Sequence, residues 1–360
     1  MLLVAVPPTK VCLMSSNDGL SGSVVAPAAT SAATSAATSA GDAARLPVSF
    51  ELFPPRSDAA AIALGRTIDR LAEYDPAFIS VTFGAGGSTR DRSLTVLSYI
   101  LEHTDVHPMA HLTCVGSTVA GASQLVRQFL DAGITSFLAL RGDPPKDAPG
   151  EGFGPDGLGE LRTAAELVQL IHRVQRERVP WLTEALPGLV RGARLHAYAT
   201  EPVEVAVACF PNGHPRSRTP DQDIDALLAK QASGATLAIT QLVFSADCYA
   251  TYVERARSAG VTIPILPGVL PITSLARLRR TLTLTGEAEP TALAAALAAA
   301  ETEQDAFDRG IEAASALLAD LVKVGAPGLH LYTLNRYDAV SAALDRLGYT
   351  ATPTSSLLRR

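Results

Sequence analysis

The chain has 360 residues, of which 47% are hydrophobic and 18% are charged, so it contains enough apolar side chains for a large core. Its net charge of -6 and the lack of a basic stripe argue against a nucleic-acid partner. No apolar run reaches the roughly 18 uninterrupted residues that a membrane span requires, so we expect no membrane partner. The length fits either two domains or one α/β barrel of about 250 residues with extensions.

The N-terminal segment differs in composition from the rest of the chain. Ala, Ser, Thr and Gly dominate it, and it contains the repeat TSAATSAATSA. Such a segment buries too little apolar surface to become ordered, so we predict a flexible low-complexity tail over residues 1–45. The first residues lack a charged n-region and contain early prolines, which argues against a secretory signal and predicts a cytoplasmic protein. Residues 351–360 are predicted to form a C-terminal tail, and Met14 remains an alternative start.

The cysteines indicate the redox environment. Cys12, Cys114, Cys209 and Cys248 form neither a CxxC pair nor a Cys/His cluster. Two of them lie within apolar runs, where cysteine behaves as a small hydrophobic residue. This pattern favours free thiols in a reducing compartment over a disulfide or a metal site, so no metal is expected.

Apolar, β-branched runs alternate with helical patterns after the tail. Eight runs predict strands, at residues 47–53, 77–83, 107–114, 134–142, 203–210, 236–244, 263–270 and 328–335. Their nearly continuous apolar character is typical of parallel strands that are buried on both faces. Helical spacing of apolar residues occurs at 59–74, 123–133, 168–178 and 226–235. An Ala-rich stretch at 291–325 predicts more than one helix.

Eight strands that alternate with helices predict a (β/α)8 TIM-type barrel over residues 46–350. A doubly wound sheet is the main alternative, and the lack of a GxGxxG motif after an early strand weakens it. Residues 180–202 are too many for an ordinary connection, so we predict an insertion there.

Polar side chains fall near the carboxyl ends of the predicted strands. They are Glu51, Thr82, His111, Thr113, Arg141, Asp143, His214, Gln241, Asn335 and Arg336. The carboxyl ends of barrel strands meet at one mouth, so we expect these residues to line a ligand cleft. Structural roles also fit them: Arg141 and Asp143 as an ion pair at the rim, and the histidines as satisfied core residues. The pattern alone therefore predicts only a barrel with a polar cleft.

Nine motifs make the sequence recognisable. SFELFPPR, FISVTFGAGGSTRDRS, HLTC, ALRGDPP, CFPNGHP, LLAKQASGA, AITQLVF, ILPGVLPI and LHLYTLNR occur in this order. Together they resemble the methylenetetrahydrofolate reductase family over roughly Val48 to Gly348. The resemblance implies a barrel flavoprotein in which FAD takes a hydride from NADH or NADPH. The reduced flavin then converts 5,10-methylenetetrahydrofolate to 5-methyltetrahydrofolate in a ping-pong reaction that feeds methionine synthesis. Short relatives generally use NADH and form homo-oligomers.

The resemblance also implies roles for four residues at the substrate. Glu51 corresponds to the general acid that protonates the leaving nitrogen of the folate, and its apolar neighbours favour a protonated carboxyl. Asp143 corresponds to the aspartate that tunes the flavin and stabilises cationic folate. Gln241 resembles the glutamine that bonds the pterin and the nicotinamide, and Arg336 lies at the substrate end of the cleft.

The residues that the resemblance implies for FAD form a larger set. They are Thr82, His111, Leu140, Arg141, Gly142, Asp143, His214, Asp223 and Lys230. Arg141, His214 and Lys230 match the partners of the pyrophosphate, and Asp223 matches a ribose ligand. Phe83, Phe210, Ala226 and Ala229 depart from polar or hydroxylated residues of relatives, which predicts looser FAD binding.

Two other functions fit parts of the pattern. One is a different flavin barrel, such as a proline-dehydrogenase-like oxidoreductase, which the SFELFPP and ITQ motifs argue against. The other is a folate- or flavin-binding protein without activity. The combination of Glu51, Asp143 and Gln241 argues against the second, because a binding protein has little need of an acid.

Overall fold

The computed structural model describes residues 45–83, 87–114, 117–142, 159–178, 202–215 and 217–352, without the side chains of 87–90. Three predictions lie wholly or almost wholly outside these residues: the tail at 1–45, the insertion at 180–202 and the placement of Asp143. Most of the predicted tail at 351–360 also lies outside them.

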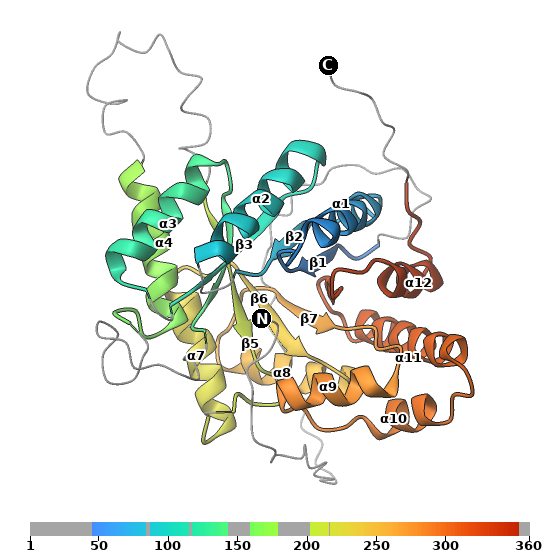
Figure 1. The fold of residues 1–360 in the computed structure, drawn as a ribbon. Coiled ribbons are helices and arrows are strands. Elements are labelled where there is room, and N and C mark those ends of the chain that lie inside the picture. The colour runs from blue at the N-terminus through green and yellow to red at the C-terminus, as the bar shows by residue number, and fades with distance from the viewer. Residues whose placement is uncertain are drawn as a thin grey trace, which may run out of the picture.

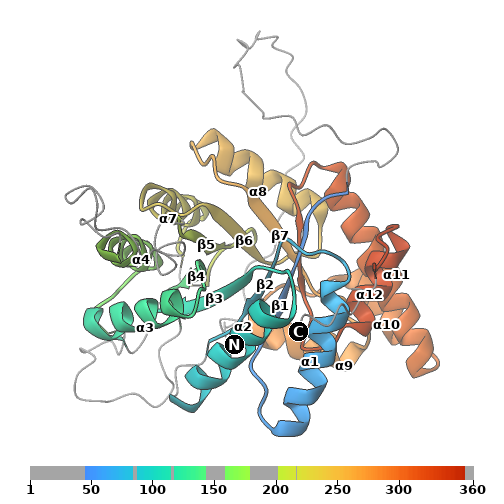
Figure 2. The ribbon, with the colours of Figure 1, turned by 90° about the horizontal axis from the view of Figure 1, so that it is seen from above.

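Eight parallel strands form a closed barrel in chain order. They are β1 (Val48–Leu52), β2 (Phe78–Val81), β3 (Pro108–Thr113), β4 (Ser136–Leu140), β5 (Glu204–Cys209), β6 (Leu237–Leu242), β7 (Ile265–Val269) and β8 (Leu329–Tyr332). Figure 2 shows the labelled strands β1 to β7 from above, with helices around them. Each strand lies within a run that the sequence predicted, so the TIM-type barrel is confirmed. The ends of most strands fall one or two residues inside the apolar runs.

Helices surround the strands (Figure 1). They are α1 (Asp58–Ala72), α2 (Gly87–His103), α3 (Val119–Asp131), α4 (Ala164–Arg178), α7 (Pro220–Ala232), α8 (Ala246–Ser258), α9 (Leu275–Thr285), α10 (Thr291–Ala298), α11 (Glu303–Lys323) and α12 (Asp338–Arg346). The Ala-rich stretch divides into α10 and α11, as predicted. No helix in the described part of the chain combines the length and the apolarity that a bilayer crossing demands.

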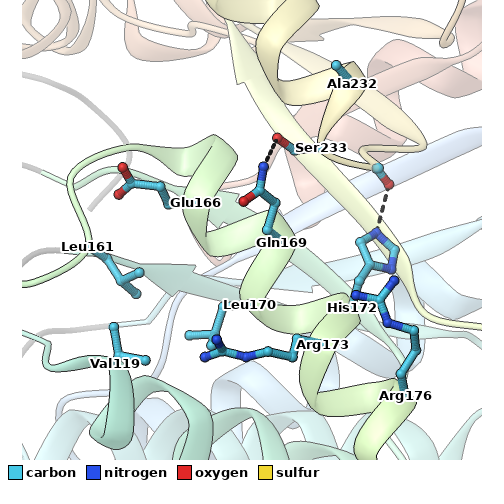
Figure 3. Close-up of a pocket in the computed structure, with 11 residues that line it drawn as sticks. Val119, Leu161, Glu166, Gln169, Leu170, His172, Arg173, Arg176, Ala232 and Ser233 are labelled. Carbon is cyan, nitrogen blue, oxygen red and sulfur yellow. Dashed lines mark hydrogen bonds between the residues drawn. The ribbon is translucent and has the colours of Figure 1, made fainter.

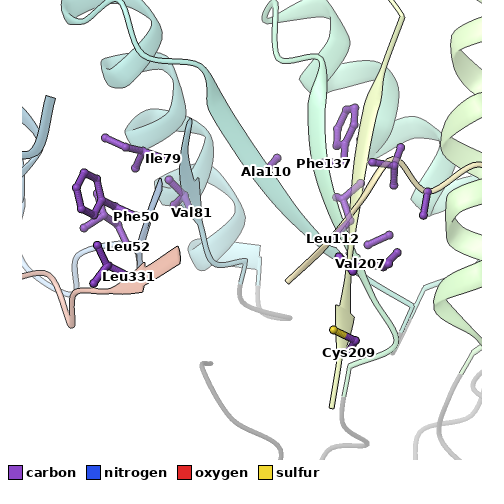
Figure 4. Close-up of a cluster of buried hydrophobic side chains, with 14 of the residues drawn as sticks. Phe50, Leu52, Ile79, Val81, Ala110, Leu112, Phe137, Val207, Cys209 and Leu331 are labelled. Carbon is purple, nitrogen blue, oxygen red and sulfur yellow. The ribbon is translucent and has the colours of Figure 1, made fainter. Parts of the chain in front are cut away.

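Side chains on the outer face of the strands join the barrel to its helices. Phe50, Leu52, Val81, Phe137 and Val207 are fully buried and belong to the main hydrophobic core (Figure 4). Successive side chains of a strand point to opposite faces, so the residues between them point into the barrel. The continuous apolar runs in the sequence arise because both faces are covered.

The inner face of the barrel has two layers. A separate cluster, here named the apolar layer, consists of Phe78, Met109, Leu138, Ala206, Ile239 and Leu266. Two residues further along β3 and β6, the inward side chains become His111 and Gln241. We name the buried Glu51, His111, Gln241, His330 and Tyr332 the polar layer. The apolar layer fills the barrel and the polar layer lies nearer the carboxyl ends of the strands, where barrel enzymes hold their substrates.

Candidate active site

Glu51 lies in β1 with 4% of its surface exposed. Its Oε2 atom is 3.6 Å from Nε2 of His111 and 3.9 Å from Nε2 of His330. Neither imidazole nitrogen has a hydrogen-bond partner, although both are buried. One carboxylate oxygen therefore faces two buried rings that come from β3 and β8.

The His111 ring is neutral at physiological pH. Burial lowers the pKa of His111 to about 4, although the nearby Glu51 opposes the change. Desolvation disfavours a charged imidazolium more strongly than a single carboxylate at 3.6 Å favours it. A neutral imidazole can either donate to or accept from a ligand through Nε2, depending on its tautomer.

The side chain of Gln241 is held by its own strand. Its Oε1 atom accepts a hydrogen bond from the backbone N–H of Leu242 at 3.0 Å, which leaves the amide NH2 group for a ligand. The Tyr332 hydroxyl donates to the carbonyl of Thr240 at 2.9 Å, so β8 is tied to the residue before Gln241. Gly268 makes this contact possible, because a Cβ there would lie 2.6 Å from the Tyr332 ring.

Tyr332 also connects the two ends of the polar layer. It is the register partner of Glu51 in the β1–β8 pair, and its hydroxyl reaches β6 across β7. The structure thus places Glu51 and Gln241 on the same inner face, and Tyr332 connects the strands that carry them. The sequence predicted that both residues line one ligand cleft, and that cleft stays a prediction.

Two cations gather near the ends of β4 and β5. Arg141 follows β4 directly, and Gly142 has a φ of 80°, a conformation that favours glycine. Lys230 on α7 donates to the carbonyl of Ala208 at 2.7 Å. Burial lowers the pKa of Lys230, Cys209 and Asp223 oppose this change, and the charge of Arg141 adds to it. Two cations close enough for one to affect the pKa of the other are suited to share an anionic ligand.

Asp223 organises the loop that follows β5. Its Oδ2 atom accepts from the backbone N–H of His214 at 3.0 Å, and Oδ1 accepts from the Ser217 hydroxyl at 2.6 Å. The Phe210 ring packs edge-on against His214, with centroids 4.7 Å apart. In this structure Asp223 therefore positions His214, a second role beside the ribose contact that the resemblance implies.

The remaining predicted residues lie at the ends of other strands. Thr82 follows β2 and is buried, whereas Leu140 ends β4 and is half-buried. Arg336 follows β8, where its guanidinium pairs with Asp338 at 2.5 Å and is largely exposed. The adjacent Asn335 bonds both backbone groups of Phe53, at 2.9 and 2.8 Å, and so joins the chain after β1 to the chain after β8.

Comparison with known proteins identifies the family. The profile of methylenetetrahydrofolate reductase matches residues 37–348. The chain is 30% identical over 312 residues to the 5,10-methylenetetrahydrofolate reductase of Pectobacterium carotovorum, covering 84% of this chain and 91% of that protein. It is also 30% identical to methylenetetrahydrofolate reductase (NADH) 1 of Zea mays, covering 84% of this chain and 48% of the maize protein.

The chain belongs to the methylenetetrahydrofolate reductase family. It is therefore an oxidoreductase that reduces methylenetetrahydrofolate. A solved structure of an uncharacterized Clostridium thermocellum protein, which binds two copies of 5-methyl-5,6,7,8-tetrahydrofolic acid, matches with a TM-score of 0.51 at 13% identity. The match covers 83% of this reductase and 93% of that chain, and it supports the fold.

Sequence reasoning missed three buried residues around Glu51 in this reductase. Ser49 precedes Glu51 on the inner face of β1, and His330 and Tyr332 occupy the inner face of β8. The alternation in LHLYTLN is the signal that could have found the last two, because His330 and Tyr332 are two residues apart. The alternation in VSFEL gives the same signal for Ser49, which lies two residues before Glu51.

An open groove of about 710 Å³ lies outside the barrel, between α3, α4 and α7 (Figure 3). Two hydrogen bonds connect α4 to the end of α7 beside it: Gln169 Nε2 donates to Ser233 Oγ at 3.1 Å, and His172 Nε2 is 2.9 Å from the carbonyl of Gly234. The walls of the groove come from these helices and the residues beside them, and the polar layer contributes none of the residues that line the groove. The groove is therefore separate from the reductase site.

Proposed function

We propose that this reductase binds FAD and uses NADH or NADPH to convert 5,10-methylenetetrahydrofolate to 5-methyltetrahydrofolate, with Glu51 as general acid. One observation carries the proposal: a buried carboxyl group faces two imidazole Nε2 atoms that have no hydrogen-bond partner, on the inner face of a barrel of this family. The NADH named in the maize relative favours NADH as the donor.

The described residues fit a flavin dinucleotide. The paired cations Arg141 and Lys230 would hold its pyrophosphate, and the unpartnered Nε2 of His111 offers a further polar contact. Gly142, with its positive φ, lets a backbone approach a ligand closely. The remaining proposed contacts are Thr82, Leu140, Asp143, His214 and Asp223. Bound FAD supplies the hydride chemistry, accepting from the nicotinamide and donating to the folate.

The role of Glu51 is to deliver a proton to the substrate. The methylene bridge of the folate must open before it can accept a hydride, and opening requires protonation of the leaving nitrogen. Glu51 is 4% exposed, so little water competes with the folate for its proton. We assign the protonation to Glu51 because it is the acidic side chain in the described polar layer.

The other proposed substrate contacts surround this acid. Gln241 presents its NH2 group, because Leu242 already bonds its Oε1 atom. That group would bond a carbonyl of the pterin or of the nicotinamide amide, which lets the two substrates use one position in turn. Asp143 would stabilise positive charge on the opened folate, and Arg336 would contact the substrate at the rim.

The experiment that tests this proposal separates the two half-reactions. Purified protein should be yellow, and anaerobic NADH should bleach its flavin bands in a stopped-flow spectrometer. Methylenetetrahydrofolate should then restore the bands and yield 5-methyltetrahydrofolate. A parallel series with NADPH identifies the preferred donor. Protein that is reconstituted with FAD yet is not reoxidised by methylenetetrahydrofolate would contradict the proposal, and sedimentation of the same sample tests for the expected homo-oligomer.

A further inference from the structure

We propose that His330 is a positioning residue for Glu51, and that Ser49 holds the His330 ring in the tautomer whose Nε2–H faces Oε2 of Glu51. The inference rests on the proposed role of Glu51 as the acid. It concerns a residue that lies one strand away from that acid and whose Nε2 atom has no hydrogen-bond partner.

The His330 ring is held in one orientation by its surroundings. It is fully buried, stacks on Phe78 with centroids 5.8 Å apart, and meets the Tyr332 ring edge-on at 5.2 Å. Its Nδ1 atom lies 2.9 Å from the Ser49 hydroxyl. With these two ring contacts and the contact at Nδ1, the ring directs Nε2 to the Glu51 carboxylate at 3.9 Å.

The Ser49 hydroxyl has two alternative acceptors, and its choice determines the His330 tautomer. When Ser49 donates to the Leu329 carbonyl, 3.3 Å away, Nδ1 of His330 must carry the proton and donate to Ser49. In a neutral ring Nε2 is then an acceptor, which would place the acidic proton on Oε2, away from Oε1. When Ser49 donates to Nδ1 instead, Nε2 carries the proton and faces Oε2 as a donor, which leaves the acidic proton on Oε1.

This arrangement serves an acid that must exist in two states. Glu51 begins the folate step protonated and ends it ionised, and a buried oxygen without a partner is costly in either state. With Nε2–H of His330 facing it, Oε2 has a donor nearby both before and after Oε1 gives its proton to the folate, and no proton has to move within the His330 ring. Oε1 has neither a hydrogen bond nor an ion pair with any residue that the structure describes, so it is the oxygen left for the folate.

The titratable groups that face Glu51 come from two strands. His111 approaches from β3, and His330 and Tyr332 approach from β8. The pKa of Tyr332 is raised strongly by burial, and the pKa of His111 is lowered, so both side chains stay neutral near neutral pH. A change in the titration of Glu51 on substitution of His330 therefore reports the loss of the His330 contact.

The test compares two substitutions at one position. His330→Asn keeps a polar group near Ser49 but removes the group that faces Glu51, whereas His330→Gln extends an amide to the place of Nε2. We expect His330→Asn to slow reoxidation of the reduced flavin by methylenetetrahydrofolate about tenfold or more, and His330→Gln to restore most of the rate. The rate of flavin reduction by NADH should stay within about twofold of the wild-type rate in both variants, since proton delivery to the folate is not part of that step.

A second readout does not depend on turnover. Infrared difference spectra between the wild type and Glu51→Gln identify the carboxyl band of Glu51, and a pH titration gives its midpoint. The midpoint should move in His330→Asn and in Ser49→Ala, and return in His330→Gln. Ser136→Ala is the matched control, because Ser136 is a buried serine on β4 whose hydroxyl bonds Glu204 at 3.3 Å.

An unchanged midpoint in His330→Asn would overturn the positioning role. So would an equal loss of both half-reactions in His330→Asn and His330→Gln, because that result marks a structural role. A wild-type protein that methylenetetrahydrofolate does not reoxidise would instead contradict the proposed function. The titration of Glu51 would still decide whether His330 and Ser49 act on it.

Discussion

The two layers inside the barrel share β3 and β6, yet they differ in how their side chains find partners. Every member of the apolar layer is buried against other apolar side chains. The polar layer instead contains two buried imidazole nitrogens without a hydrogen-bond partner, on His111 and His330. A buried unsatisfied polar group costs about 1–3 kcal/mol of stability. The apolar layer therefore stabilises the barrel, whereas the polar layer gives up stability for ligand binding and proton transfer.

Glu51→Gln should have the largest effect of any substitution in the polar layer. The substitution keeps the shape of the side chain but removes the proton that the folate needs. We expect the folate half-reaction to slow about 10²–10⁴-fold, which corresponds to about 3–5 kcal/mol of transition-state stabilisation. Reduction of the flavin by NADH should be retained, as measured by anaerobic stopped flow. Equal damage to both half-reactions would contradict the assignment of Glu51 as the acid.

Met109→Ala tests the apolar layer in the same way. Met109 is 1% exposed and lies two residues before His111 on β3. Truncation of a fully buried methionine should lower the free energy of unfolding by about 2–5 kcal/mol, measured by urea denaturation. The rate of the folate half-reaction in the folded fraction should change little. Ile62→Ala is the control, since Ile62 is 63% exposed on α1 and should cost less than about 0.5 kcal/mol.

His111 in the polar layer predicts a pH dependence of the free energy of unfolding. The pKa of His111 is about 4 in the folded protein, below its ordinary value of 6.5, so the unfolded chain binds more protons between these values. Stability should therefore fall as the pH drops from about 6.5 to about 4, by at most about 3 kcal/mol from this group. His111→Gln should remove that part of the loss in urea titrations of the apoprotein.

The control for this titration is His103→Gln, because His103 is exposed near the end of α2. It should leave the acid loss of stability as in the wild type. If His111→Gln and the wild type lose stability in parallel from pH 6.5 to 4, the His111 ring is not held neutral by burial. The contrast between a buried and an exposed histidine separates the loss of stability caused by desolvation of His111 from the loss caused by protonation of carboxylates.

The sequence predicted the barrel because its strands are buried on both faces. Such strands read as continuous β-branched runs, and all eight runs coincide with strands. Glu51 and Gln241 were identified because the resemblance supplied their roles. His330 and Ser49 were not, because their contact joins residues 281 apart and exists only once β8 closes on β1. A one-residue change of register would turn either side chain outward, so sequence alone does not specify the pair.

The smallest predicted effect concerns a hydrogen bond that connects two strands of the polar layer. Tyr332→Phe removes the hydrogen bond from the Tyr332 hydroxyl to the Thr240 carbonyl, 2.9 Å long and buried. We expect a loss of about 1 kcal/mol in unfolding free energy. We also expect a rise in KM for methylenetetrahydrofolate, because Gln241 follows Thr240 directly.

Tyr249→Phe is the matched variant for Tyr332→Phe. Its hydroxyl also donates to a backbone carbonyl, that of Ile265 at 2.7 Å, but it lies on α8 outside the barrel. The two variants should lose similar stability, since each leaves one buried carbonyl without its donor. Of the two variants, only Tyr332→Phe should change KM, because Tyr332 connects the strand of Glu51 to the strand of Gln241 and Tyr249 does not. Equal KM values in the two variants would mean that the backbone of β6 positions Gln241 without help from β8.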